Sequence, residues 1–225
     1  MAGEADQAAP DMTTTRGGTL LIGTSNPSKV ARWAAALPNH RVVAPWDIAA
    51  TLDVDESAGN VLDNAVRKAR AYAARSGLVT LSEDAGLRVH ALGGTPGVKL
   101  RTWGGTVTGR LSDEELAATL RSLLAGVKDT SATFDIAVAV AAPDGFVRTA
   151  QRASEGWFDL ERLDPAAEEG NPLASAFISS ETGAAWTEMV DLKDRPESSR
   201  RFVATIESLV SEVVSHEVKA SGSKR

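Results

Sequence analysis

The chain has 225 residues, and its 30 aspartate and glutamate residues outnumber its 24 lysine and arginine residues, which gives a formal net charge of −6. This acidic balance argues against polymeric nucleic acid as a partner, because such surfaces need a basic excess. The absence of cysteine excludes disulfides, thiolate zinc sites and cysteine nucleophiles. A small anionic substrate remains compatible with the composition, provided that cations gather locally.

The first half of the chain predicts alternating strands and helices. Short aliphatic runs are typical of buried strands, and the alanine-rich or amphipathic segments between them favour helices. Pro38 and Gly77 stand just after the two helical segments, where such residues end helices. In chain order we expect a strand at 19–23, a helix at 28–37, a strand at 41–44, a helix at 61–74 and a strand at 78–82.

The second half predicts a hairpin between two helices. Ser112, followed by three acidic residues, is a typical N-cap for a helix at 112–124. Asp144 and Gly145 favour a tight turn between strands at 132–142 and 146–154. A last helix is expected at 198–214. Strands and helices that first alternate and then give way to a hairpin predict an α/β fold, with a mixed sheet and flanking helices.

Both ends of the chain are polar and lack apolar periodicity. We therefore expect a disordered leader at 1–17, one folded domain at 18–215 and a disordered tail at 216–225. The start has no basic segment followed by an apolar run, and no stretch of about 18 apolar residues occurs anywhere. These observations predict no membrane span, no membrane partner and a cytoplasmic location.

Polar residues follow the first predicted strand. Thr24, Asn26 and Lys29 lie at the turn into the next helix, where free backbone N–H groups and the helix dipole favour an anion such as phosphate. The alternative is that Asn26 or Ser28 simply caps the helix and Lys29 is solvated.

The helix at 61–74 carries two polar stripes. Helical spacing places Asp63 beside Arg67 and Asn64 beside Lys68. Taken alone, these pairs are equally compatible with ordinary surface contacts.

Two adjacent carboxylates, Glu83 and Asp84, are expected at a strand end, followed by Gly86. Neighbouring carboxylates repel one another unless a cation, a proton or solvent compensates them, so a Mg²⁺ site is one interpretation of this turn. A solvated acidic turn is the other.

Together these segments resemble the inosine triphosphate pyrophosphatase family. The family's T-x-N-x-x-K motif is matched by Thr24, Asn26 and Lys29. Its E-x-G-x-T-F-x-E-N-A-x-x-K-A motif is matched by Glu56, Asn64, Ala65, Lys68 and Ala69, with Asp63 in place of the second glutamate. Its D-D-S-G-L-x-V-x-A-L-G-G-x-P-G-V motif is matched closely by 83–98. The likeness spans most of 20–204.

The resemblance implies a two-lobed mixed α/β fold with the substrate in the cleft between the lobes. It also implies Mg²⁺-dependent hydrolysis of a non-standard nucleoside triphosphate to the monophosphate and pyrophosphate, by a homodimer. Residue by residue, it implies Asp63 and Asp84 as metal ligands, with Asp84 also as general base and Lys68 as a catalytic phosphate contact. The implied substrate contacts are Thr24, Asn26, Lys29, Asn64, Arg195, Arg200 and Arg201.

The second half departs from the family pattern. The family's G-F-G-Y-D-P-x-F loop, whose phenylalanine stacks on the base, corresponds to 170–177, where Asn171 replaces that ring. Arg200 stands where histidine is expected, and Ala85 replaces a serine. Base stacking contributes roughly 1–3 kcal/mol, so its loss predicts altered base recognition.

Three functions are therefore compatible with the sequence: a nucleoside triphosphate pyrophosphatase of altered specificity, a nucleotide-binding protein that has lost catalysis, and a hydrolase that acts on another nucleotide in a specialised pathway. The glycines at 93–97 do not follow the first strand, which argues against a dinucleotide-binding dehydrogenase.

Overall fold

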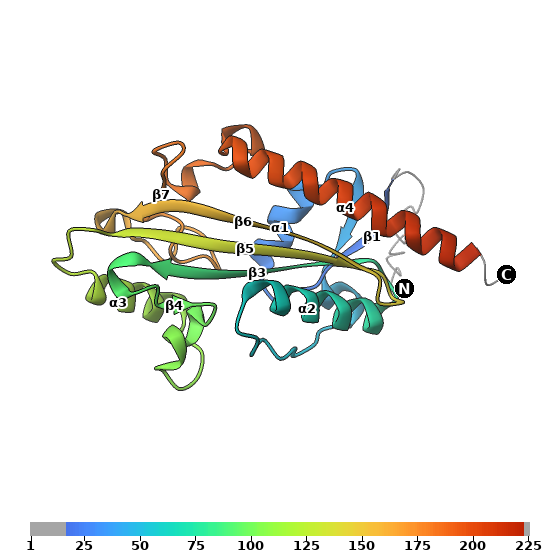
Figure 1. The fold of residues 1–225 in the computed structure, drawn as a ribbon, viewed down its shortest axis with the longest axis horizontal. Coiled ribbons are helices and arrows are strands. Elements are labelled where there is room, and N and C mark those ends of the chain that lie inside the picture. The colour runs from blue at the N-terminus through green and yellow to red at the C-terminus, as the bar shows by residue number, and fades with distance from the viewer. Residues whose placement is uncertain (1–16, 223–225) are drawn as a thin grey trace, which may run out of the picture.

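The computed structural model describes residues 17–222, which form one seven-stranded mixed sheet with helices on both faces (Figure 1). The predicted α/β class is thus confirmed. The leader expected at 1–17 lies outside the described residues, except for Gly17, which begins the first strand. The strands are β1 (Gly17–Ile22), β2 (His40–Val43), β3 (Thr80–Val89), β4 (Pro96–Gly97), β5 (Ser131–Ala141), β6 (Val147–Phe158) and β7 (Phe177–Ser179).

Four α-helices accompany the sheet within the described residues, and local sequence explains where three of them begin. Asn26 caps α1, Asn60 caps α2, and Ser112 forms a capping box with Glu115 at α3. The α-helices are α1 (Pro27–Ala36), α2 (Val61–Ser76), α3 (Asp113–Leu123) and α4 (Glu197–Gly222). Short 3₁₀ helices lie at Pro45–Ile48, His90–Leu92, Leu100–Gly105, Leu160–Arg162, Trp186–Glu188 and Leu192–Asp194.

The strand order is β2-β1-β3-β5-β6-β7, and β4 pairs with β3. Strand β1 is parallel to β2 and β3, whereas each neighbouring pair in the order β3-β5-β6-β7 is antiparallel. Along β3, only the first two residues, Thr80 and Leu81, pair with β1. The remainder of that edge of β3 is free of β1, and the candidate site lies there.

The long strands β3, β5 and β6 run through both lobes of the molecule (Figure 1). In the first lobe, α1 and α4 pack on one face of the sheet, through Trp33, Ile206 and Val210, and the alanine-rich side of α2 packs on the other. In the second lobe, α3 and the β6–β7 region enclose a separate core around Phe134 and Phe177. Two cores on shared strands give the two-lobed shape that the resemblance implied.

Two sequence expectations are wrong. Strand β3 does not end at Ser82 but continues to Val89, because ten consecutive residues pair with β5. The carboxylates of Glu83 and Asp84 are therefore in mid-strand, and the alternation of a strand sends them to opposite faces of the sheet. The disordered tail expected at 216–225 is helical as far as 222, because α4 continues there and His216 stacks on Phe146 and contacts Asp144 at 2.7 Å; 223–225 lie outside the described residues. Within the described residues, no helix is long and apolar enough to cross a bilayer.

Candidate active site

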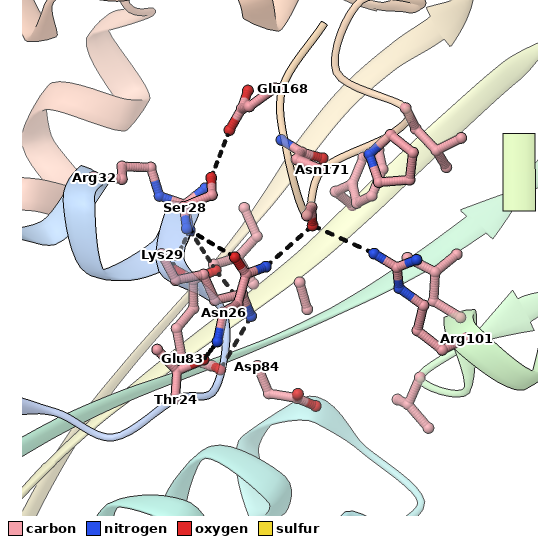
Figure 2. Close-up of a pocket in the computed structure, with 18 of the residues that line it drawn as sticks. Thr24, Asn26, Ser28, Lys29, Arg32, Glu83, Asp84, Arg101, Glu168 and Asn171 are labelled. Carbon is pink, nitrogen blue, oxygen red and sulfur yellow. Dashed lines mark hydrogen bonds and ion pairs between the residues drawn. The ribbon is translucent and has the colours of Figure 1, made fainter. Parts of the chain in front are cut away.

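A cavity of about 740 Å³ lies between the two lobes, at the edge of β3 that β1 leaves free. Figure 2 shows residues from α1, from β3 and from the segment around Gly170 converging on it. Many of its lining side chains are charged, and cations outnumber acids. The cations are Lys29, Arg32, Lys68, Lys99, Arg101, Arg110, Arg152 and Arg195, and the acids are Asp53, Glu56, Glu83, Asp84 and Glu168.

The start of α1 forms one wall of the cavity. Asn26 accepts a hydrogen bond from the backbone N–H of Ser28 at 2.9 Å, so it caps the helix as the sequence allowed. The hydroxyl of Thr24 accepts from the backbone N–H of Asn26 at 3.1 Å and fixes the turn. The positive end of the helix therefore faces the cavity, where it favours an anion.

Glu83 contacts two cationic side chains of α1, Arg32 and Lys29. Its carboxylate accepts two hydrogen bonds from Arg32, at 2.7 and 2.8 Å, and one from the indole N–H of Trp33 at 2.9 Å. Lys29 lies 3.6 Å from the same carboxylate. Burial alone would raise the pKa of Glu83, but the charges of Arg32 and Lys29, with hydrogen bonds from Arg32 and Trp33, lower it to about 2. Glu83 is thus a fixed anion that holds α1 against the sheet.

Asp84 lies on the other face of β3, against α2. Lys68 Nζ is 2.8 Å from Asp84 Oδ1 and 3.2 Å from Glu56 Oε2. Burial lowers the pKa of Lys68, but the two carboxylates outweigh burial, and the net shift is upward. The amide of Asn64 donates to Asp84 Oδ2 at 3.1 Å and accepts from the backbone of Ala58 at 3.0 Å. Asn64 therefore positions Asp84 and the segment that carries Glu56, and it does not line the cavity.

The structure does not bring Asp63 to this site. Asp63 is exposed in the first turn of α2, where it accepts a hydrogen bond from Asn60 at 2.8 Å. The second acid beside Asp84 is instead Glu56, which lines the cavity. The expected pairing of Asp63 with Asp84 as metal ligands is corrected accordingly.

The donor set fits a Mg²⁺ ion that is bound jointly with phosphate. Among residues 17–222, no three His, Asp or Glu side chains come together to hold a metal ion. Glu56 and Asp84 do converge on one ammonium group, however. Mg²⁺ in nucleotide sites is commonly held by one or two carboxylates together with substrate phosphates, so two carboxylates suffice when the substrate supplies the remaining oxygens.

The predicted arginines divide into two groups. Arg195 lines the cavity, and its Nε donates to the carbonyl of Met189 at 3.3 Å. Arg200 and Arg201 are exposed at the start of α4, because that helix turns Ser199 and Val203 toward the cavity instead. Arg200 donates to the carbonyl of Lys193 at 3.0 Å, and Arg201 pairs with Glu197. Neither Arg200 nor Arg201 lines the cavity, so the structure does not place these two expected substrate contacts at the site.

The segment around Gly170 contacts the start of α1 and forms another wall of the cavity. The carbonyl of Gly170 accepts from Asn26 at 3.1 Å and from Arg101 at 3.4 Å, as the dashed lines in Figure 2 mark. Ser28 donates to Glu168 at 2.9 Å, and the backbone N–H of Gly170 donates to Asp113 at 2.9 Å. Asn171 lines the cavity, whereas Phe177 is fully buried in the second core.

Comparison with known proteins identifies the family of this chain. Residues 20–207 match the model of the Ham1 family. A dITP/XTP pyrophosphatase from Thermus thermophilus is 32% identical over 188 residues, which cover 83% of this chain and 87% of the relative. Another from Desulforamulus reducens is 35% identical over 141 residues, covering 61% of this chain and 69% of the relative. The chain belongs to the Ham1 family.

Solved Ham1 structures share the fold. The Ham1 protein of Staphylococcus aureus superposes with a TM-score of 0.66 at 20% identity, over 86% of this chain and 98% of that chain. A HAM1 protein from Coxiella burnetii gives the same TM-score and identity, over 87% and 99%. These structures show the shared fold, and the family match with the dITP/XTP pyrophosphatase relatives confirms the resemblance that the motifs indicated.

Sequence reasoning missed several residues that shape this Ham1 site. Glu56 stood in a matched motif, but no role was assigned to it. Arg32 and Arg152 belong to none of the matched motifs, and the contact of Arg101 with Asp113, at 2.6 Å, joins distant segments. These roles depend on tertiary packing, because each residue meets partners many positions away in the chain.

Proposed function

We propose that this protein hydrolyses a nucleoside triphosphate, with Mg²⁺, to the monophosphate and pyrophosphate, with base recognition altered from that of its relatives. The observation that carries the proposal is the cluster of Glu56, Lys68 and Asp84, which lines a 740 Å³ cavity together with Lys29 and the N-terminus of α1. The relatives named dITP/XTP pyrophosphatases support the same reaction class.

The cations of the cavity suit the triphosphate. Lys29 and Lys68 supply positive charge, and the N-terminus of α1 adds free backbone N–H groups. Thr24 and Asn26 hold this turn in place. These groups stabilise the charge that develops on the departing pyrophosphate, because they are already oriented before the reaction begins.

Asp84 is the proposed general base. Lys68 and Asn64 fix its two oxygens, so the carboxylate is oriented before substrate binds. Asp84 accepts a proton from a water molecule as that water attacks the α-phosphorus, and the bond to the β-phosphate oxygen breaks to release pyrophosphate. Glu56 and Asp84 would hold Mg²⁺, which neutralises phosphate charge when bound.

The apolar part of the cavity lining is the proposed nucleoside site. Its apolar surface includes Phe134, Ile136, Leu173, Trp186 and Phe202. Asn171 occupies the place of the expected stacking ring and offers an amide in place of an aromatic face. Because Asn171 replaces the aromatic ring, we propose that side-chain hydrogen bonds and the neighbouring arginines recognise the base.

A panel assay tests the proposal. Pyrophosphate release is measured with Mg²⁺ for dITP, XTP and the standard ribo- and deoxyribonucleoside triphosphates. Turnover of at least one triphosphate, lost in Asp84→Asn, is expected. Binding of nucleotide without turnover in the wild type would favour the catalytically impaired alternative, and release of free base or phosphate from nucleoside monophosphates would favour a different hydrolase. The implied homodimer is tested by light scattering, and the implied cytoplasmic location by cell fractionation.

A further inference from the structure

Three arginines from three separate elements line the same part of the cavity: Arg32 of α1, Arg152 of β6 and Arg195, which precedes α4. Arg152 is paired across the sheet with Ile136, which is paired with Ala85. Residues directly opposite one another share a face, so Arg152 lies on the face of Glu83 and Ala85, not on that of Asp84. Arg152, like Arg32 with its contact to Glu83, therefore lies on the opposite face of β3 from Asp84, although all three side chains line one cavity.

The acids nearby do not neutralise this cluster. Glu83 already accepts both hydrogen bonds from Arg32, one from Trp33, and the charge of Lys29. Glu168 accepts from Ser28, and Glu181 from Ser198. Within residues 17–222, neither Arg152 nor Arg195 forms an ion pair with any of these carboxylates. One buried carboxylate thus faces three guanidinium groups and a lysine.

Among the three arginines, Arg152 has a buried hydrogen-bond donor that no described residue satisfies. Its Nη1 is buried and has no hydrogen-bond partner among the described residues. The group's other contact is with the ring of Phe202, whose centroid is 5.6 Å from Arg152 Cζ. A buried guanidinium donor without a partner is unfavourable, because arginine stays charged and donates in every direction of its plane. Burial, together with the charge of Arg32, lowers the pKa of both Arg152 and Arg195 and outweighs the opposing effect of the Glu83 carboxylate.

A neutral ligand would not resolve this arrangement. A carbonyl oxygen could accept one of the free N–H groups, but it would leave the excess positive charge uncompensated. A carboxylate or phosphate accepts two parallel N–H bonds from a guanidinium and also neutralises charge. An oxyanion group is therefore favoured on the Glu83 face of β3, where Arg32 and Lys29 contact the same carboxylate, and not on the Asp84 face.

We propose that Arg32, Arg152 and Arg195 form a second anion-binding subsite, which takes a carboxylate or phosphate carried by the nucleoside part of the substrate. This inference rests on the proposed function, because it places the triphosphate at Lys29 and Lys68 and the nucleoside toward the arginines. It narrows the substrate class to nucleotides that carry an additional negative group on the base or the sugar.

The test compares matched substrates. 5-Carboxy-dCTP is compared with dCTP, and the 3′-phosphate of ATP with ATP, so that one pair tests a carboxylate on the base and the other a phosphate on the sugar. We expect the wild type to prefer the additionally charged member of at least one pair by roughly tenfold to a hundredfold in kcat/KM, the range of a charge-assisted hydrogen bond. Arg152→Met is expected to reduce that preference to about onefold, and Arg152→Lys to retain part of it.

Arg148→Met is the matched control. Arg148 lies on the same strand, but it pairs with Glu212 at 2.7 Å and does not line the cavity. The preference should be unchanged in this variant. Equal rates for both members of both pairs in the wild type, or a preference that survives Arg152→Met, would overturn the subsite. Circular dichroism verifies that each variant is folded.

Binding without turnover separates the two proposals. 5-Carboxy-2′-deoxycytidine and adenosine 3′-phosphate lack the triphosphate, so calorimetry with these probes reports on the arginines alone. Binding that depends on Arg152, with no hydrolysis of any triphosphate, retains the subsite and overturns the proposed function. Hydrolysis without any preference, and without binding of these probes, retains the function and overturns the subsite.

Discussion

Lys68 Nζ lies 2.8 Å from Asp84 Oδ1, and both side chains are largely buried. An ammonium and a carboxylate enclosed together hold one another in the charged form, and a buried partner left alone is strongly unfavourable. Because the pair also lines the cavity, it combines a structural contact with the chemistry proposed for the site.

Replacement of Asp84 tests the proposed base. Asp84→Asn is expected to reduce kcat by roughly a hundredfold to ten-thousandfold, because the amide cannot accept the proton of water. The rate of pyrophosphate release under saturating substrate measures this effect. Asn keeps the size of the side chain, and circular dichroism with a thermal melt verifies the fold. A variant that retains more than a tenth of the wild-type kcat would exclude Asp84 as the base.

The second prediction distinguishes Glu56 from Asp63. Glu56→Gln should increase the Mg²⁺ concentration needed for half-maximal activity by about tenfold or more, because one of the two carboxylates at the proposed metal site is lost. Asp63→Asn, which changes an exposed residue in the first turn of α2, should shift this value by less than twofold. Mg²⁺ titrations of the two variants at constant ionic strength make the comparison. The reverse order of effects would restore Asp63 as the ligand.

The sequence predicts the elements better than the side-chain directions. Hydrophobic periodicity and the Asp144–Gly145 turn place most helices and strands, because both depend on neighbouring residues. Spacing alone cannot decide which face of a helix meets the sheet. Asp63 and Asn64 are adjacent, yet only Asn64 turns inward, since the buried side of α2 is set by packing against β5.

The strand end that the sequence predicted after Ser82 shows the same limit of prediction from local sequence. Glu83 and Asp84 interrupt an apolar pattern, and two adjacent acids normally favour a turn. The strand continues here because partners distant in sequence neutralise each carboxylate on its own face: Arg32 and Lys29 for Glu83, and Lys68 for Asp84. Likewise, Arg200 and Arg201 resemble phosphate ligands in sequence, but the helix that carries them turns both outward.

A third prediction concerns the stability of the site. Glu83→Gln leaves Arg32 and Lys29 without their shared counter-charge, and we expect a loss of about 2–3 kcal/mol in the free energy of unfolding. This is below the roughly 3–5 kcal/mol measured when a fully buried pair is broken, because Arg32 is partly exposed. Urea denaturation measures the change. Glu212→Gln, which breaks the exposed pair with Arg148, is the control and should cost less than about 1 kcal/mol. Equal effects of the two substitutions would contradict the assigned role of Glu83.

The last prediction concerns the contact between Gly170 and Asn26. Gly170 has a φ of +76°, and a Cβ atom there would lie 2.6 Å from Asn26 Oδ1. Gly170→Ala therefore adds a clash to the backbone strain. Asn26 must rotate, which weakens its cap on α1, at a cost of about 0.5–2 kcal/mol in stability, and displaces the turn proposed to bind phosphate.

Gly183 is the matched control. It has a similar φ of +69° with nothing within 4 Å of a Cβ atom, so Gly183→Ala carries the backbone strain of about 1–2 kcal/mol without the clash. We expect Gly170→Ala to unfold at a lower urea concentration than Gly183→Ala and to raise KM severalfold, while Gly183→Ala leaves KM unchanged. Indistinguishable KM values in the two variants would show that the contact between Gly170 and Asn26 does not shape the phosphate site.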